Sequence, residues 1–203
     1  MNNNNVTLSA NGGFNGSGTA TRTINLGNGL WTISTTGTST PWNMATTTGL
    51  TFNANGSTIS FTGVGNAVRT FAGGGLTYST VSFGPNTSGA TGALISGANT
   101  FAALTLVAPF NLSLTALVTQ TVTALNSNGS PGSVNFIDAS SASQATINAA
   151  AGTITISYTV IRNMVFGGGA TFRAGNSFNL GNNSGITITP PTMTRSRGWS
   201  GMT

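Results

Sequence analysis

The amino-acid sequence predicts an all-β fold of the β-helix or solenoid type, built from short strands, with a β-sandwich as the alternative. Three observations lead to this prediction. Asn, Gly, Ser and Thr dominate the chain, and these residues are weak helix formers. Apolar and polar residues alternate over short stretches, as they do in half-buried strands. Segments of similar sequence recur after roughly 20–25 residues, which is the size of one β-helix coil.

Short strands are predicted wherever alternation lies between turn signals. Asn-Gly pairs begin at residues 11, 15, 28, 55 and 128, and Gly triplets occupy 73–75 and 167–169; the Asn-Gly pairs favour turns that need a positive φ. The one candidate for a helix is the Ala-rich stretch 140–151, which is short and lacks a capping box. In chain order, the predicted strands cover residues 23–26, 30–33, 50–52, 59–61, 104–106, 112–114, 120–125 and 153–158.

Internal similarity favours the solenoid over the sandwich. Residues 77–83 resemble residues 100–106, and residues 121–125 form a weaker copy of the same pattern. Residues 51–57 also resemble residues 171–177, and residues 71–75 resemble residues 166–169. In a solenoid each strand pairs with its copies in the neighbouring coils, so that inward side chains form ladders and Asn side chains stack at corners. A low charge fits this arrangement, because stacked like charges repel.

The ends of the chain differ from its middle. We predict a polar N-terminal arm or cap over residues 1–20, a β-rich repeat domain over 21–189 and a C-terminal tail over 190–203. Residues 1–5 show neither the basic region nor the apolar region of a signal peptide. Pro190 and Pro191 should end the last strand. In the tail, Arg195, Arg197 and Trp199 are candidates for docking to a partner, because Arg and Trp are favoured interface anchors; the alternative is an unattached end.

The scarcity of charge excludes several classes of function. Charged residues make up 3% of the chain, Asp138 is the only acid, and Cys, His and Lys are absent. A clustered metal site, a paired-carboxylate glycosidase and a Ser-His-Asp triad all need residues that are missing. We therefore predict no catalytic residue, no cofactor and no metal. The formal charge of +5 reflects missing acids, and scattered Arg residues do not form a nucleic-acid-binding face. No apolar run reaches the roughly 18 residues of a membrane span.

Asp138 stands out as the lone acid. It is predicted to form a structural ion pair with Arg162 or with Arg173. The alternative is that it forms one half of an enzyme site, such as that of a capsule depolymerase, which another chain completes.

Five segments carry a resemblance to a known class of proteins. Residues 29–34, 49–54, 69–78, 167–177 and 181–185 resemble Gly/Thr/Asn-rich structural proteins of tailed bacteriophage virions, such as tail fibres, tail spikes and capsid decorations, and related repeats of bacterial surface adhesins. The resemblance covers roughly residues 20–189. It implies a β-helical or β-rich fold, frequent homotrimers and no catalytic motif. In that class the Gly-Asn-Asn-Ser-Gly stretch is commonly followed by Trp, whereas Ile186 follows it here and Trp199 comes later.

The composition and the resemblance together leave four functions to be considered. The first is a structural virion protein that forms an oligomer, most readily a homotrimer with Phe and Leu faces buried between subunits, and that contacts other virion proteins or a host surface glycan. The second is an adhesin-type module on the bacterial cell surface, in which Tyr78, Tyr158 and the Trp residues bind sugars. The third is ice binding through Thr-x-Thr pairs, whose irregular spacing argues against it. The fourth is the enzyme named above.

Overall fold

The computed structural model describes residues 5–9, 13–34, 39–62, 68–85 and 92–192, and within them every regular element is a β-strand. No helix in this part of the chain has the length and apolar character needed to cross a membrane. Sheet A contains β1 (Val6–Leu8), β4 (Leu30–Ile33), β7 (Thr58–Phe61), β9 (Thr77–Phe83), β11 (Thr100–Val107), β13 (Thr119–Asn128), β15 (Ala145–Ala149), β16 (Thr153–Ser157), β18 (Met164–Gly168), β19 (Thr171–Gly175) and β21 (Ile186–Ile188).

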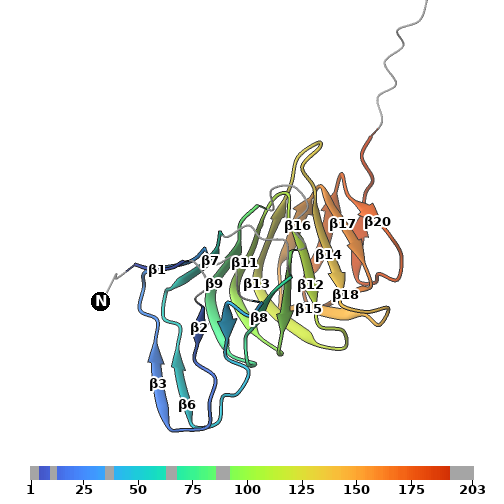
Figure 1. Ribbon diagram of the computed structural model, residues 1–203. Coiled ribbons are helices and arrows are strands. Elements are labelled where there is room, and N and C mark those ends of the chain that lie inside the picture. The colour runs from blue at the N-terminus through green and yellow to red at the C-terminus, as the bar shows by residue number, and fades with distance from the viewer. Residues whose placement is uncertain (1–4, 10–12, 35–38, 63–67, 86–91, 193–203) are drawn as a thin grey trace, which may run out of the picture.

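A second and a third sheet complete the coils. Sheet B contains β2 (Phe14–Asn15), β5 (Trp42–Asn43), β8 (Arg69–Ala72), β10 (Ala93–Ser96), β12 (Asn111–Leu114), β14 (Asn135–Ala139), β17 (Thr159–Arg162) and β20 (Phe178–Asn179). The small sheet C pairs β3 (Arg22–Asn25) with β6 (Leu50–Asn53), which lie side by side and reach away from the larger sheets at the N-terminal end (Figure 1). Residues 1–20, predicted as an arm or cap, contribute β1 and β2 to sheets A and B.

The chain winds as a parallel solenoid. It passes back and forth between sheets A and B, and each strand inside these sheets pairs in parallel with strands from the coils before and after it. This topology confirms the predicted β-helix and excludes the β-sandwich, whose hairpins and Greek keys need antiparallel neighbours. The strands stack along one axis from β1 to β21 (Figure 1).

The main internal repeat corresponds to strand register. Thr77 lies opposite Thr100, and Thr100 lies opposite Thr121, so the three similar segments form neighbouring strands β9, β11 and β13. The other two similarities do not mark neighbours. Residues 51–57 begin in β6 of sheet C whereas 171–177 begin in β19 of sheet A, and 71–75 leave sheet B whereas 166–169 lie at the end of β18 in sheet A. These matches reflect shared corner composition.

The Ala-rich stretch 140–151 forms strand β15 and not a helix. Ala145, Ile147 and Ala149 are buried, whereas Thr146 and Asn148 between them are partly exposed. The inward positions therefore follow the period of two that a strand requires.

Along one inward ladder of sheet B the side chains become smaller after Trp42. Each member of this ladder lies opposite the next: Phe14, Trp42, Phe71, Ile95, Leu114 and Ala139. Trp42 is the centre of an aromatic cluster, with its ring stacked 4.6 Å from Phe14 and 6.2 Å from Phe71 between centroids. Aromatic packing thus fills the N-terminal coils, and aliphatic residues fill most of the later ones.

Tyr78 joins this cluster through its hydroxyl group. The side chain is 1% exposed; its hydroxyl donates to the Gly73 carbonyl oxygen at 2.8 Å and accepts the Trp42 Nε1–H at 3.3 Å. Burial raises the pKa of this hydroxyl above its ordinary value, because a phenolate is poorly solvated in an apolar core. In the unfolded chain the group ionises near pH 10. Its contribution to stability is therefore complete below about pH 10 and declines as the pH rises further.

We expect Tyr78→Phe to change stability in two ways. At pH 7 it should lower the free energy of unfolding by about 1–2 kcal/mol, because two buried polar groups lose their partner. Above about pH 10 it should make the decline of stability with pH shallower than in the wild type. Urea unfolding at stepwise pH values from neutral to alkaline measures both effects. Stability curves that stay parallel across the alkaline range would contradict the assigned burial of this hydroxyl.

Candidate functional site

The structure places Asp138 and Arg162 next to each other. Asp138 lies on β14 and Arg162 at the end of β17, and the two residues are opposite each other in adjacent parallel strands. Arg173 lies elsewhere, on β19 of sheet A, opposite Thr155 and Thr187. The candidate docking residues Arg195, Arg197 and Trp199 lie outside the described residues. Of the three residues considered for a structural ion pair, the structure thus joins Asp138 with Arg162.

The ion pair has a buried acid and an exposed base. The Asp138 side chain is 7% exposed and that of Arg162 is 49% exposed. Arg162 donates from Nε to Asp138 Oδ2 at 2.9 Å and also from Nη2, while Asn163 Nδ2 donates to Oδ1 at 3.1 Å. The carboxylate raises the pKa of the Arg162 guanidinium through its hydrogen bonds to Nε and Nη2 and through its charge. The guanidinium also lies over the Phe136 ring, 5.7 Å from its centroid.

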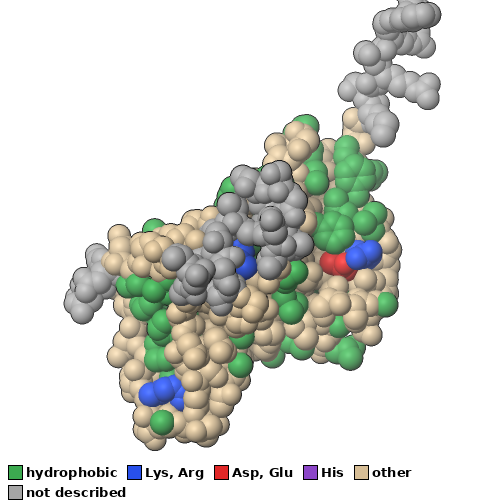
Figure 2. Space-filling view, viewed as in Figure 1, with side chains coloured by type: hydrophobic (Ala, Val, Ile, Leu, Met, Phe, Trp, Pro, Cys, Tyr) green, Lys and Arg blue, Asp and Glu red, His purple; other side chains and the backbone are tan. Residues whose placement is uncertain are grey.

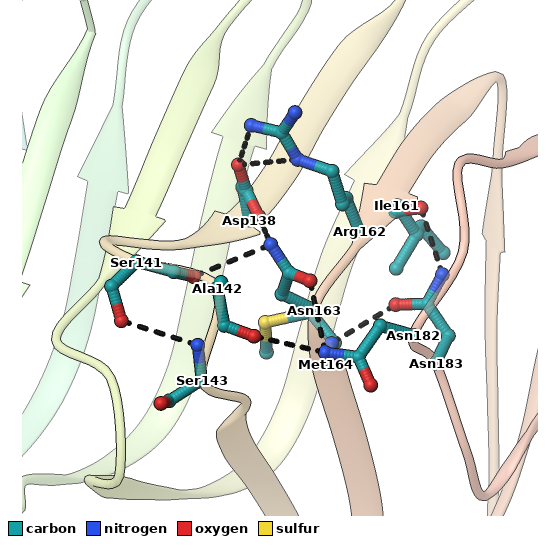
Figure 3. A network of polar contacts seen from close by, with 10 residues as sticks. All are labelled: Asp138, Ser141, Ala142, Ser143, Ile161, Arg162, Asn163, Met164, Asn182 and Asn183. Carbon is teal, nitrogen blue, oxygen red and sulfur yellow. Dashed lines mark hydrogen bonds and ion pairs between the residues drawn. The ribbon is translucent and has the colours of Figure 1, made fainter.

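An asparagine corner supports the acid from the side. Asn163 and Asn182 both have a φ of 55°, in the left-handed region that Asn tolerates at turns. Asn182 Nδ2 donates to Asn163 Oδ1 and to the Ala142 carbonyl oxygen, both at 3.0 Å. Figure 3 shows this network joining three successive turns of the chain to Asp138. The carboxylate is therefore fixed by its own coil and by the coils that follow.

A groove of about 420 Å³ opens beside the ion pair. It is lined by Asp138, Arg162 and Asn163, by Ser113 of β12, and by the turn at residues 139–142. The polar lining follows from register, because Ser113, Asp138 and Arg162 are successive members of one outward ladder on sheet B. A second groove of about 380 Å³ lies at the ends of β11 and β13 and contains no charged residue in its lining.

An apolar ladder runs beside the polar one. Asn111, Phe136, Val160 and Phe178 lie opposite one another on successive strands, two positions before the members of the polar ladder on their own strands. Phe178 is 42% exposed, and Leu180 beyond it is 53% exposed. We name Phe136, Val160 and Phe178 the apolar rank. Figure 2 shows hydrophobic side chains next to the chain's one acidic side chain and its basic neighbour.

The groups that line the groove and its rim decide what it can do chemically. The single carboxylate already accepts hydrogen bonds from Arg162 and Asn163. The ionisable groups in the lining of the groove are this carboxylate and the Arg162 guanidinium, which are paired with each other. The groove offers hydroxyl, amide, carboxylate and guanidinium groups next to exposed apolar side chains, and these act through hydrogen bonds and hydrophobic contact.

We expect Arg162→Ala to lower thermal stability more than the matched change Arg173→Ala. Removing Arg162 leaves the buried Asp138 carboxylate with Asn163 as its one remaining side-chain donor among the described residues, and an under-compensated buried charge is destabilising. Arg173 is exposed on sheet A, so its removal should have little effect. Melting curves of the two variants at low and moderate salt compare them. Equal melting temperatures would show that the ion pair is structurally irrelevant.

Sequence reasoning missed the apolar rank and the asparagine corner. The outward position of Phe136 and Phe178 depends on which face of sheet B is solvated, and alternation alone does not fix that choice. Asn163 had a usable signal, since it lies between two short apolar runs.

Comparison of the chain with protein-family models, with curated proteins and with solved structures finds no match.

Proposed function

We propose that the chain is a structural β-solenoid module of a tailed-bacteriophage virion, part of an oligomeric fibre, spike or capsid-surface decoration. The observation that carries the proposal is the parallel solenoid with uncharged ladders in register. The Gly/Thr/Asn-rich segments, which resemble those of virion proteins, add support. The alternative is an adhesin-type module on the bacterial cell surface, which the groove beside Asp138 favours.

The outward face of sheet A illustrates why this surface suits close assembly. One outward ladder runs through β1, β4, β7, β9, β11 and β13 and contains only hydroxyl and amide side chains: Thr7, Thr32, Ser60, Ser82, Thr105 and Asn126. Charges of one sign at these positions would repel at the roughly 4.8 Å spacing of neighbouring strands. An uncharged surface also lets many identical subunits pack closely without strong mutual repulsion.

The oligomeric part of the proposal is a homotrimer. The Phe and Leu side chains expected between subunits mostly fill the core of the single chain, and those left exposed among the described residues are few: Leu30, Leu117, Phe178 and Leu180. Contacts between subunits therefore form through uncharged polar faces and through strand edges. Few charged residues lie at these edges to prevent them from pairing with strands of another subunit. The same lack of charge makes a free monomer poorly soluble.

Two measurements test the proposal. Mass photometry of the purified chain at micromolar concentration should give about three times the 20.3 kDa chain mass, and a stable monomer would contradict the oligomer. Peptide mass spectrometry of particles purified from a lysate should detect the chain at structural stoichiometry. Its presence in the host envelope fraction and absence from particles would overturn the virion assignment and favour the adhesin.

A further inference from the structure

We propose that the groove beside Asp138 and Arg162, together with the apolar rank, binds an uncharged saccharide chain. The site adds a ligand class to the proposed function. It rests on that function in one respect, since a virion or surface module would present such a site to a cell. Two adjacent ladders on sheet B form the site whatever that setting is.

The two ladders form an amphipathic surface with a regular spacing. The polar ladder runs through Ser113, Asp138 and Arg162, and the apolar rank runs parallel to it. Neighbouring members of a ladder are about 4.8 Å apart along the axis, and the two ladders are about 6.7 Å apart along the strands. A sugar ring is of this size, and it has an apolar face and a hydroxyl-bearing rim. A saccharide lying along the axis would place rings on the apolar rank and hydroxyl groups over the polar ladder.

The polar groups match the needs of sugar hydroxyls, which both donate and accept hydrogen bonds. Arg162 has five N–H donors, and Asp138 accepts two of them, which leaves three that no described residue accepts. Ser140 and Ser141 at the rim of the groove are exposed and add hydroxyls of either polarity. Asp138 is fixed by its partners before any ligand arrives, so binding does not have to order it.

The charge balance of the groove selects an uncharged ligand. Asp138 and Arg162 neutralise each other, so the pair supplies no net charge that would favour an acidic or a basic sugar over an uncharged one. The formal charge of +5 on the whole chain attracts acidic polymers, but that attraction is spread over the surface and is screened by salt. Binding in the groove should therefore persist at high salt, unlike adsorption of an acidic polymer.

The groove at the ends of β11 and β13 serves as an internal comparison. Its lining includes Thr105, Val107 and Asn126 and contains neither a charged nor an aromatic residue. Of these two grooves, only the one on sheet B has charged groups in its lining, and the apolar rank with the exposed Phe178 ring runs beside it. Pockets that bind small molecules combine apolar walls with a few fixed polar groups in this way.

The test is a binding assay with defined oligosaccharides. The neutral probes are maltoheptaose, cellohexaose, galactan oligomers and chitohexaose, and the acidic probes are polygalacturonate and hyaluronan oligomers. The blocking variant is Ala142→Trp, which places a large side chain in the exposed turn that lines the groove. The matched control is Ala102→Trp, at an exposed position of β11 in sheet A. Phe178→Ala shortens the apolar rank without filling the groove.

The wild type and Ala102→Trp should bind at least one neutral probe with equal affinity in low and high salt. Ala142→Trp should abolish this binding, and Phe178→Ala should weaken it about tenfold. Melting temperatures near that of the wild type show that the variants are folded. Failure of the wild type to bind any neutral probe, or undiminished binding by Ala142→Trp, would overturn the site. So would a change in native mass with Ala142→Trp, because it would make the groove a subunit contact. Mass spectrometry of purified particles and the native mass of the chain test the proposed function independently of this binding assay.

Discussion

Trp42→Ala should lower the free energy of unfolding by about 3–5 kcal/mol, the range for removing a large aromatic side chain from a core. Trp42 is fully buried and its ring contacts Phe14, Phe71 and Tyr78 at centroid distances of 4.6 to 6.4 Å. The change also removes the Nε1–H donor to the Tyr78 hydroxyl. Neighbouring coils fix the backbone on both sides, so the surroundings can close the resulting cavity only in part. Urea unfolding followed by circular dichroism measures the loss.

The matched control for this prediction is Trp31→Ala. Trp31 belongs to the same cluster, 6.1 Å from Trp42, but its side chain is only partly buried. Its removal should therefore destabilise the protein clearly less than removal of Trp42. Equal losses for the two variants would place the centre of the aromatic core elsewhere.

Gly168→Ala should destabilise the protein by about 2–4 kcal/mol, because it combines an unfavourable backbone conformation with a backbone collision. Gly168 has a φ of 91°, and it lies opposite Ala149 in the neighbouring strand. A Cβ atom added there would overlap the Ala149 carbonyl oxygen. Since that oxygen belongs to a backbone held by its own coil, one of the two coils must move.

Gly152→Ala separates the two causes. Gly152 has nearly the same φ, 89°, but a Cβ atom there meets no atom within 4 Å. Only the conformational cost remains, which is about 1–2 kcal/mol. Thermal or urea unfolding of both variants measures the difference. If Gly168→Ala costs no more than Gly152→Ala, then β15 and β18 are not packed as closely as the structure has them.

The sequence predicts the solenoid where coils are similar in length and content. The segments that begin at Thr77, Thr100 and Thr121 have matching inward residues, and their similarity reproduces the observed register. Elsewhere the distance between partners varies: Leu30 pairs with Thr58, 28 positions later, whereas Thr153 pairs with Thr171, 18 positions later. A search for a fixed period misses coils whose turns differ so much in length, and it admits matches between corners of similar composition.

The sequence likewise predicts one part of the candidate site and not the rest. A lone acid in a chain with few charges predicts a specific contact for Asp138, but both Arg162 and Arg173 satisfy the requirement for a base on a nearby strand. The choice depends on which sheet each strand joins, and β17 joins sheet B whereas β19 joins sheet A. Asn163 and Asn182 support Asp138 from corners where their own backbone is left-handed. An Asn-rich composition favours such corners, but it does not show which Asn residues form them.

Distances between spin labels test whether the coils of the solenoid stack in register. Because the chain has no Cys, labels can be attached at introduced Cys pairs along one outward ladder: Ser60 with Asn126, Thr32 with Asn126 and Thr7 with Asn126. Dilution with unlabelled protein suppresses distances between subunits. The solenoid predicts backbone separations of about 14, 19 and 24 Å, which grow by one strand spacing per step. Separations that do not increase in equal steps would contradict the solenoid.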